Sequence, residues 1–508
     1  MKIRILRWSV SLLLIFTVFS MKAQTTDELL QLGTHEIQGT ARFSGMGGAF
    51  NALGGDFGSL STNPAGIGTY RSSEFVITPS LTINKAITDF RQESLSDSRT
   101  RFGLANLGYI GTYLTKNSEG LVSFSFGLGY NKLANFYKST KLRGYDSPNS
   151  VLRFFPQYAN NLKLNADALQ GEFSNILPED WSTSIAFNTE MMVYDPDSRA
   201  YYENGIEPND VVDINSTVYQ SGGNDEYTLS FGGNISNKFQ FGVTIGLQDL
   251  EYINRLKYGE QYLGNLNGYQ SSLRDEYTRT VGFGANAKFG IIYRPTDALR
   301  LGVAIHTPTF FNMEREYWVS MESVYKIDGA DDLQSEESPS DLYEYRLQTP
   351  YRMEAGIAYI IGKIGLISLD YELVGNNAVR IHDDFVSDDF ISGRNEGLKN
   401  NYQVSSNVRV GAEVNLPYGI MLRGGFNYFQ SPYKDSDLDY SRYAYSGGIG
   451  FRGKHCFADF SYTLNTGDYH FAPYYVNDYR IRNGDTNPDI AVEKLKVGRI
   501  LATIGFKF

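Results

Sequence analysis

Long stretches of the chain alternate apolar and polar residues with a period of two. The pattern runs through residues 227–235, 239–248, 281–291 and 407–414. In 239–248, FQFGVTIGLQ, the two Phe, Val, Ile and Leu fall on one face, and Gln, Gly and Thr fall on the other. A period of two is the repeat of a β-strand, because successive side chains point to opposite faces. The chain is therefore predicted to be all-β, with strands that have one apolar face.

The spacing of the strands separates a membrane barrel from an exported soluble all-β protein. We predict fourteen strands, at residues 73–84, 103–116, 120–138, 226–237, 239–257, 275–294, 298–314, 343–360, 362–375, 401–415, 418–430, 441–452, 455–470 and 497–508. Long connections are predicted at 85–102, 139–225, 258–274, 315–342, 376–400, 431–440 and 471–496, and short turns alternate with them. Bacterial outer-membrane barrels combine an even strand number with short turns at one end and long loops at the other. The predicted fold is an antiparallel transmembrane β-barrel of about 14 strands over residues 71–508.

The N-terminal residues have the order of a secretory signal peptide. Lys2, Arg4 and Arg7 precede an apolar run at 8–19, and the small residue Ala23 follows it. The run is short for a spanning helix, which needs ~20 apolar residues. We expect residues 1–23 to be a signal peptide that is removed on export, with a retained membrane anchor as the alternative.

Composition and motifs exclude several functional classes. The net charge of -11 argues against a nucleic-acid partner, and no later segment has the ~18 continuous apolar residues of a spanning helix. The single cysteine, Cys456, excludes an internal disulfide and a cysteine-based zinc site. The five histidines are scattered, and neither H-E-x-x-H nor G-x-S-x-G is present. We therefore expect no catalytic site, no cofactor and no metal.

The final predicted strand is amphipathic and closes on phenylalanine. One face of the strand carries Ile500, Ala502, Ile504, Phe506 and Phe508. Such an ending resembles the signal read by the outer-membrane barrel assembly machinery, with an ordinary terminal strand as the alternative. Together with the signal peptide, Phe506 and Phe508 predict that this machinery is a partner during biogenesis.

A glycine-rich segment lies between the signal peptide and the first strand. SGMGGAFNALGGDFGSLSTNPAGIGTY, residues 44–70, contains neither G-x-G-x-x-G nor G-x-x-x-x-G-K-[ST], so it is not a phosphate loop. It is too short to bury a core of its own, whereas its glycines let the backbone pass close to other side chains. A fourteen-stranded barrel has a lumen that is either open or plugged. Residues 24–70 are therefore predicted to plug the lumen, with Pro64 fixing a turn after Asn63.

This segment resembles the N-terminal hatch of the FadL/TodX family. The resemblance rests on glycines and an Asn-Pro-Ala motif, namely Gly45, Gly47, Gly48, Gly54, Gly55, Asn63, Pro64 and Ala65. Members of that family are transporters of long-chain fatty acids and other hydrophobic compounds across the Gram-negative outer membrane. The resemblance implies a fourteen-stranded barrel, a hatch that blocks the pore, and exit of the substrate sideways through the wall into the membrane.

The resemblance also implies a substrate groove among the extracellular loops and a lateral opening. The longest connection, 139–225, is the candidate for the groove. Its candidate side chains are Phe154, Phe155, Tyr158, Leu162 and Trp181. Packing of these side chains onto the barrel rim is the alternative. For the opening, Gly127 and Gly129 in the third strand are the candidate kink, because glycine weakens a strand.

The combined expectation is a monomeric channel for hydrophobic compounds, such as long-chain fatty acids, in the outer membrane of a Gram-negative bacterium. Its expected partners are the lipid bilayer and a hydrophobic small molecule, besides the assembly machinery. Two alternatives stay open. A hemin or other nutrient receptor needs an iron ligand such as His35 or a loop tyrosine. A barrel acting as a secretion or assembly partner needs no small-molecule site.

Overall fold

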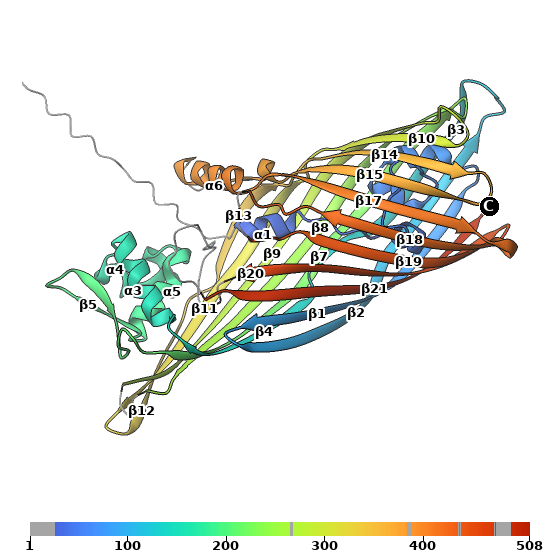
Figure 1. Cartoon of the computed structure of the whole chain (residues 1–508). Coiled ribbons are helices and arrows are strands. Elements are labelled where there is room, and N and C mark those ends of the chain that lie inside the picture. The colour runs from blue at the N-terminus through green and yellow to red at the C-terminus, as the bar shows by residue number, and fades with distance from the viewer. Residues whose placement is uncertain are drawn as a thin grey trace, which may run out of the picture.

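The computed structural model describes residues 26–264, 268–383, 388–434, 436, 438–471, 473 and 489–508. The predicted signal peptide, residues 1–23, lies outside these described residues. The strands form one closed antiparallel barrel, because β1 (Glu74–Phe90) pairs with β2 (Glu93–Leu114) on one side and with β21 (Ala491–Lys507) on the other (Figure 1). Closure removes the two free edges that an open sheet would have at β1 and β21.

Nineteen strands share this sheet. Besides β1, β2 and β21 they are β3 (Leu121–Asn135), β4 (Lys138–Ser147), β7 (Val212–Ile235), β8 (Phe239–Tyr262), β9 (Gly268–Tyr293), β10 (Leu299–His306), β11 (Phe310–Ile327), β12 (Ala330–Glu337), β13 (Asp341–Gln348), β14 (Arg352–Ile361), β15 (Gly365–Gly375), β16 (Arg380–His382), β17 (Val404–Asn415), β18 (Ile420–Phe429), β19 (Arg442–Arg452) and β20 (Cys456–Phe471). The chain crosses the barrel wall 14 times, because some crossings consist of two strands that lie end to end. We call each crossing a wall position. The predicted fourteen-stranded barrel is confirmed.

The alternating sequence pattern corresponds to the two faces of the wall. On β8, Phe241, Val243 and Ile245 point outward and expose 37–48% of their surface, whereas Gln240 and Thr244 point inward and are fully buried. A barrel with an apolar outside and a polar inside is the arrangement of transmembrane β-barrels. The lipid-facing surface is therefore built from the apolar half of each strand.

Three predicted long connections, 85–102, 258–274 and 315–342, are wrong. Most of their residues belong to strands that extend beyond the apolar band, and β1 turns directly into β2 at residues 91–92. Outside a bilayer a strand no longer has to present apolar side chains outward, so the apolar outer face that marks a spanning strand ends there. The sequence pattern consequently underestimates the length of these strands.

Two predicted strands, 298–314 and 343–360, are each divided. The first is interrupted between β10 and β11 around Pro308, and the second between β13 and β14 around Pro350. Proline has no backbone N–H to donate to the ladder, so a strand is interrupted where it occurs. Each divided strand still fills one wall position, because β10 pairs with β14 while β11 pairs with β13.

The connection between β4 and β7 forms a small extracellular domain instead of a loop. It contains α3 (Val151–Leu162), α4 (Ala166–Leu169), η3 (Phe173–Asn175), η4 (Pro178–Asp180), α5 (Trp181–Asn188), β5 (Met192–Asp195) and β6 (Ala200–Glu203). Its apolar side chains share one core with the extended ends of β8, β9 and β11. Outside this domain, the helix α6 (Asp388–Asn401) follows β16, and the short helix η5 (Asn376–Ala378) precedes β16. A last short helix, η6 (Pro417–Gly419), forms the turn between β17 and β18.

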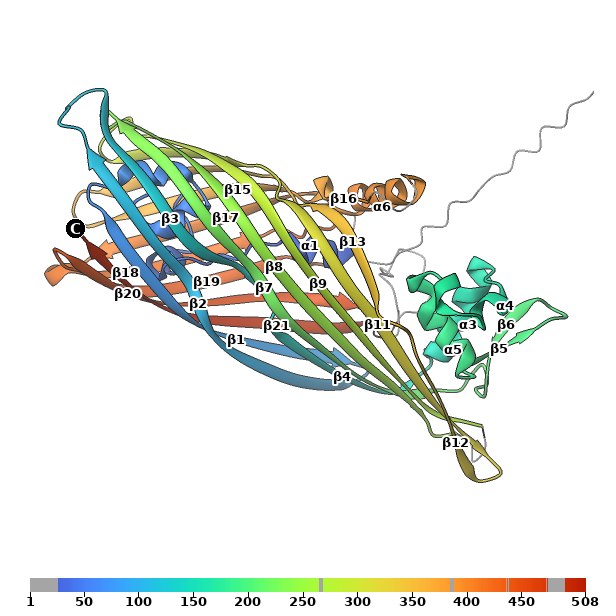
Figure 2. The same ribbon diagram turned by 180° about the vertical axis from the view of Figure 1, so that it is seen from behind.

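The N-terminal segment lies inside the barrel. It consists of α1 (Thr26–Leu32), α2 (Ala41–Gly45), η1 (Phe57–Ser61) and η2 (Pro64–Thr69), and Figure 2 shows these blue elements surrounded by strands. Most of its side chains from Gln38 to Gly68 are buried. Among the described helices, none is long and apolar enough to cross a bilayer. The segment is therefore a hatch that fills the lumen, and we use that name for residues 26–70.

Candidate functional site: the lumen pocket beside the hatch

A hydrogen-bonded turn at Asn63 fixes the lower part of the hatch. The Asn63 Oδ1 accepts a hydrogen bond from Ala65 N at 3.0 Å, and its Nδ2 donates to Asn51 O at 2.7 Å. Pro64 occupies the first position of η2, where a missing N–H has no cost. The Asn-Pro-Ala motif thus joins two separate parts of the hatch.

Wall glycines make room for this turn. A Cβ at Gly290 of β9 would lie 1.9 Å from Asn63 Oδ1, and a Cβ at Gly242 of β8 would lie 2.2 Å from Pro64 O. Gly242 and Gly290 are cross-strand partners, so their missing side chains form one shallow recess. Sequence reasoning identified the hatch glycines and missed these wall glycines. The sequence feature that could have identified them is a glycine at the lumen-facing position of each of two neighbouring strands.

Buried charges attach the hatch to the opposite side of the wall. Arg42 forms two hydrogen bonds with Glu413 of β17, each 3.0 Å long. Glu413 also binds Arg423 of β18 at 2.6 Å, and Arg423 in turn binds Asp459 of β20 at 2.7 Å. Such a network is costly to break, because removing one partner leaves a buried charge uncompensated. The hatch is therefore docked by both shape and charge.

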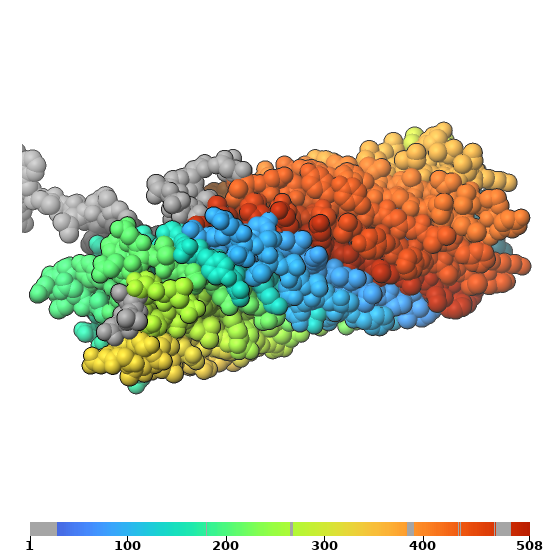
Figure 3. Space-filling model, turned by 60° about the horizontal axis from the view of Figure 1, so that its bottom comes forward, coloured from blue at the N-terminus to red at the C-terminus, as the bar shows by residue number. Residues whose placement is uncertain are grey.

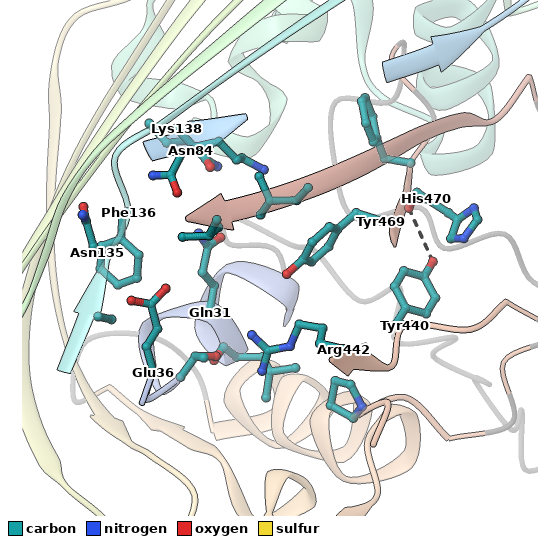
Figure 4. Close-up of a pocket in the computed structure, with 18 of the residues that line it drawn as sticks. Gln31, Glu36, Asn84, Asn135, Phe136, Lys138, Tyr440, Arg442, Tyr469 and His470 are labelled. Atoms are coloured by element: carbon teal, nitrogen blue, oxygen red, sulfur yellow. Dashed lines mark hydrogen bonds between the residues drawn. The ribbon is translucent and has the colours of Figure 1, made fainter. Parts of the chain in front are cut away.

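A cavity of about 310 Å³ lies in the upper lumen beside α1 (Figure 4). This volume is at the lower end of the ~300–1,000 Å³ found for small-molecule sites. The lining is mostly apolar and aromatic, and comes from α1, β1, β3, β4, β7, β19, β20 and β21. Its apolar members are Leu30, Ala134, Phe136, Pro432, Tyr433, Tyr440, Tyr469, Phe471, Leu495 and Val497. The cavity thus offers apolar surface together with several polar groups.

The charged residues of the pocket differ in whether they are already paired. Lys138 binds Glu493 of β21 at 2.8 Å, and Glu36 binds Arg499 at 2.7 Å. The Arg442 guanidinium lies over the Phe429 ring, 5.2 Å from its centroid, and forms no ion pair with any described residue. In Figure 4, Arg442 reaches from the start of β19 toward α1. Arg442 is thus a cation available to an anionic group inside the pocket.

The barrel wall lacks a backbone ladder next to this pocket, between β2 and β4, and we call this place the opening. The ladder between β2 and β3 runs from Leu114 paired with Ser123 to Asn106 paired with Asn131. Beyond Asn106, the described part of β2 pairs only with β1, while β4 pairs only with β7. Backbone hydrogen bonds therefore do not join β2 to β4.

A cation–aromatic stack bridges this opening. The Arg99 guanidinium of β2 lies 3.8 Å from the ring centroid of Tyr137, and its Nη1 donates to Gln220 O at 3.3 Å. Phe136, Lys138 and Gln220, which adjoin these contacts, all line the pocket. The stack thus lies between the pocket and the outside of the wall. Side chains hold this part of the wall together in place of a ladder.

Known structures share this architecture. A Pseudomonas aeruginosa FadL homologue has a TM-score of 0.54 and 11% identity, and covers 94% of this chain and 100% of its own. The chain has the FadL/TodX fold. The Pseudomonas putida toluene transporter TodX gives a TM-score of 0.52 at 12% identity, with coverage of 94% and 99%. The Ralstonia pickettii toluene transporter TbuX gives 0.50 at 13% identity, with coverage of 93% and 99%. No protein-family model and no curated protein matches the sequence.

Within the FadL/TodX fold, the predicted kink at Gly127 and Gly129 is wrong. Both residues lie in regular ladders with β2 and β7. Their missing side chains serve the hatch instead, because a Cβ at Gly129 would lie 2.1 Å from the Phe57 ring. The ladder ends further along the same strand, after Asn131.

The predicted loop groove is also wrong. Phe155 and Trp181 are buried in the core that the extracellular domain shares with the strands, and Trp181 stacks on Tyr317. Phe154 packs against that core, and Tyr158 donates a hydrogen bond to Asp180 at 3.0 Å. Leu162 ends α3 at the half-buried surface of the domain. Burying these large apolar side chains stabilises the domain, which corresponds to the packing alternative.

The histidine considered as a heme ligand has little space around it. His35 lines a cavity of about 60 Å³, far below the ~300 Å³ at the lower end of ligand sites. Burial, together with the nearby Arg352, lowers the pKa of His35 well below its usual range, so the imidazole is neutral. Within the described residues no three His, Cys, Asp or Glu side chains are grouped for a metal ion.

The last predicted pair lies on the outside of the closing strand. Phe506 belongs to β21 and is 46% exposed, and Phe508 follows the strand and is 70% exposed. Both remain accessible to a protein that recognises the end of the strand. Their recognition by the assembly machinery stays a prediction.

Proposed function

We propose that the protein is an outer-membrane channel for hydrophobic compounds that carry an anionic group, such as long-chain fatty acids. The proposal rests mainly on Arg442, an arginine without an ion-pair partner among the described residues, in a pocket beside the hatch whose other charged side chains, Lys138 and Glu36, are already paired. A carboxylate binds arginine through charge-assisted hydrogen bonds, whereas the apolar tail is stabilised by burial. TodX and TbuX are described as toluene transporters, which supports a hydrophobic cargo.

The proposed route leaves the lumen sideways. The pocket adjoins the opening between β2 and β4, and the hatch fills the lumen below it. Moving an apolar compound from the pocket into water raises its free energy, whereas moving it into the lipid hydrocarbon does not. We infer that the compound leaves between β2 and β4, after Arg99 separates from Tyr137.

Binding of two ligands that differ only in their head group tests the proposal. The ligands are a fluorescent long-chain fatty acid and the alcohol of the same chain length, titrated against the purified protein in detergent. A lost charged hydrogen bond is worth ~1.5–3 kcal/mol, so Arg442→Gln is expected to weaken acid binding roughly 10- to 150-fold. The same substitution should leave alcohol binding unchanged.

Arg143→Gln is the matched control, because Arg143 is an exposed residue of β4 outside the pocket lining. Equal effects of the two substitutions would place the ligand elsewhere. Binding of neither ligand would reject the channel proposal and favour a barrel that serves as a secretion or assembly partner. Saturable binding of secreted proteins from the same cells would then support that alternative.

A further inference from the structure

Two lysines face each other on the outside of the barrel at the seam between its first and last strands. Lys85 of β1 and Lys496 of β21 are cross-strand partners, and both side chains are exposed. Figure 3 shows the blue strands β1 and β2 beside the red strands β20 and β21 on one face of the molecule. Like charges directly opposite on neighbouring strands destabilise a sheet. A compensating group would therefore relieve the repulsion between the two lysines.

The described protein residues do not supply that group. Neither lysine forms an ion pair there, although the chain has a net charge of -11. Two outward carboxylates lie higher on the neighbouring strands: Asp468 of β20 is the partner of Lys494, and Asp89 of β1 binds Lys494 at 2.8 Å. An anion from outside the described chain can therefore take this place.

The lysine pair marks the outer edge of the lipid-facing surface. Toward the short-turn end, the next pairs on these two strands are Ile83 with Gly498 and Leu81 with Ile500, which carry no charge. Lys85 and Lys496 are thus the first charged pair above the apolar band. In an outer-membrane barrel the long loops are extracellular, so this level corresponds to the head groups of the outer leaflet.

Hydroxyl groups extend the row on both sides. Ser98 of β2 is the partner of Lys85, and Thr466 of β20 is the partner of Lys496, so all four residues share the outward face. Tyr443 of β19, the partner of Thr466, is exposed and continues the row. Ammonium and hydroxyl groups are the side-chain donors that bind phosphate oxygens.

We propose that the row Ser98, Lys85, Lys496 and Thr466 binds the phosphate group of a phosphorylated lipid in the outer leaflet. The phosphate neutralises both lysines, and its acyl chains lie along the apolar pairs below. Because the row is at the membrane surface and not in a concave aqueous pocket, the source of the phosphate is a lipid and not free phosphate. Such a lipid covers the seam where the barrel closes.

The proposal is tested with a bisphosphorylated lipid A, its dephosphorylated form and inorganic phosphate, each added to the full-length barrel in a neutral detergent. Native mass spectrometry counts the bound lipid, and gel mobility after heating gives the unfolding midpoint. The test variant is Lys85→Gln/Lys496→Gln. The control is Lys363→Gln/Lys454→Gln, which removes the same charge from two short turns at the opposite end.

Lipid A is expected to bind the wild type and the control, and to bind the test variant at least ~10-fold more weakly. Without lipid the test variant should unfold at the same or a higher temperature than the wild type, because the repulsion between the lysines is gone. Equal binding of lipid A to both double variants would overturn the proposal. An equal shift of the unfolding midpoint with inorganic phosphate, or equal retention of the dephosphorylated lipid, would overturn it as well.

Discussion

Replacing one wall glycine should release the hatch without unfolding the barrel. The change is Gly290→Ala, whose new Cβ would lie 1.9 Å from Asn63 Oδ1. Real carbon–oxygen contacts are far longer, so either β9 or the Asn63 turn must move. β9 is held by ladders with β8 and β10 on both sides, whereas the turn is held by fewer bonds. The turn is therefore expected to move.

The contacts at the turn set the magnitude. Displacing Asn63 breaks its buried hydrogen bonds with Ala65 N and Asn51 O, each worth ~1 kcal/mol. Overpacking of a dense contact costs a further ~1–3 kcal/mol. Hatch docking should weaken by about 3–5 kcal/mol, which raises the ratio of undocked to docked hatch by roughly two to four orders of magnitude.

Sugar efflux from liposomes measures the undocked fraction. Gly290→Ala should leak small sugars, whereas the wild type should not, and both should show the same heat-dependent gel mobility of a folded barrel. Gly424→Ala is the control, because a Cβ at Gly424 of β18 meets no atom within 4 Å. Absence of sugar leakage from both variants would refute the close contact between Asn63 and the wall. Loss of the folded barrel in Gly290→Ala alone would show that the strand moved and not the hatch.

Three further predictions concern the plug, the lipid-facing surface and the lateral opening. Deletion of residues 27–68 should leave a folded barrel that conducts sugars freely, and a sealed barrel after deletion would refute the plug. Val243→Arg, within the apolar band, should destabilise the barrel by ~2–4 kcal/mol in denaturant titrations, while Asp249→Arg, above the band, should cost ~0–1. Equal costs would mean that the band is misplaced. Arg99→Ala removes a cation–aromatic contact worth ~0.5–2 kcal/mol, so release of a bound fluorescent fatty acid into lipid should accelerate several-fold. An unchanged release rate would exclude the stack with Tyr137 as a barrier.

The sequence pattern predicts the wall well because the bilayer imposes it. Every spanning strand must present apolar side chains to lipid and polar ones to the lumen, so alternation and turn spacing lead to the correct strand number. The pattern is lost where the environment changes. On the outer half of β11 the alternation is reversed, because Val319 and Met321 point inward into the core of the extracellular domain while Ser320 and Glu322 point outward. Pro308 and Pro350 interrupt strands that the pattern alone joins.

The pocket is harder to predict because no local pattern specifies it. Arg442, Phe136 and Leu30 come from three distant parts of the chain, and only barrel closure places them around one cavity. Sequence reasoning selected aromatic residues in the longest connection instead, and those form the core of a small domain. Aromatic density is a sign of burial, and it does not distinguish a ligand site from a packed core.

One wall residue contacts the hatch and also lies at the edge of the lateral opening. It connects movement of the hatch with release of the compound through the wall in the proposed mechanism. Asn131 is in the last pair of the β2–β3 ladder, and its Nδ2 donates to Ser61 Oγ of the hatch at 2.9 Å. Ser61 lies two residues before Asn63, so a displacement of the Asn63 turn also acts on the end of this ladder. A ligand that shifts the hatch changes the contacts of the opening through the same residues, provided that it binds the two hatch positions with different affinity. Gly290→Ala is therefore expected to increase both sugar leakage and the rate of lateral release, whereas Arg99→Ala should increase only the release.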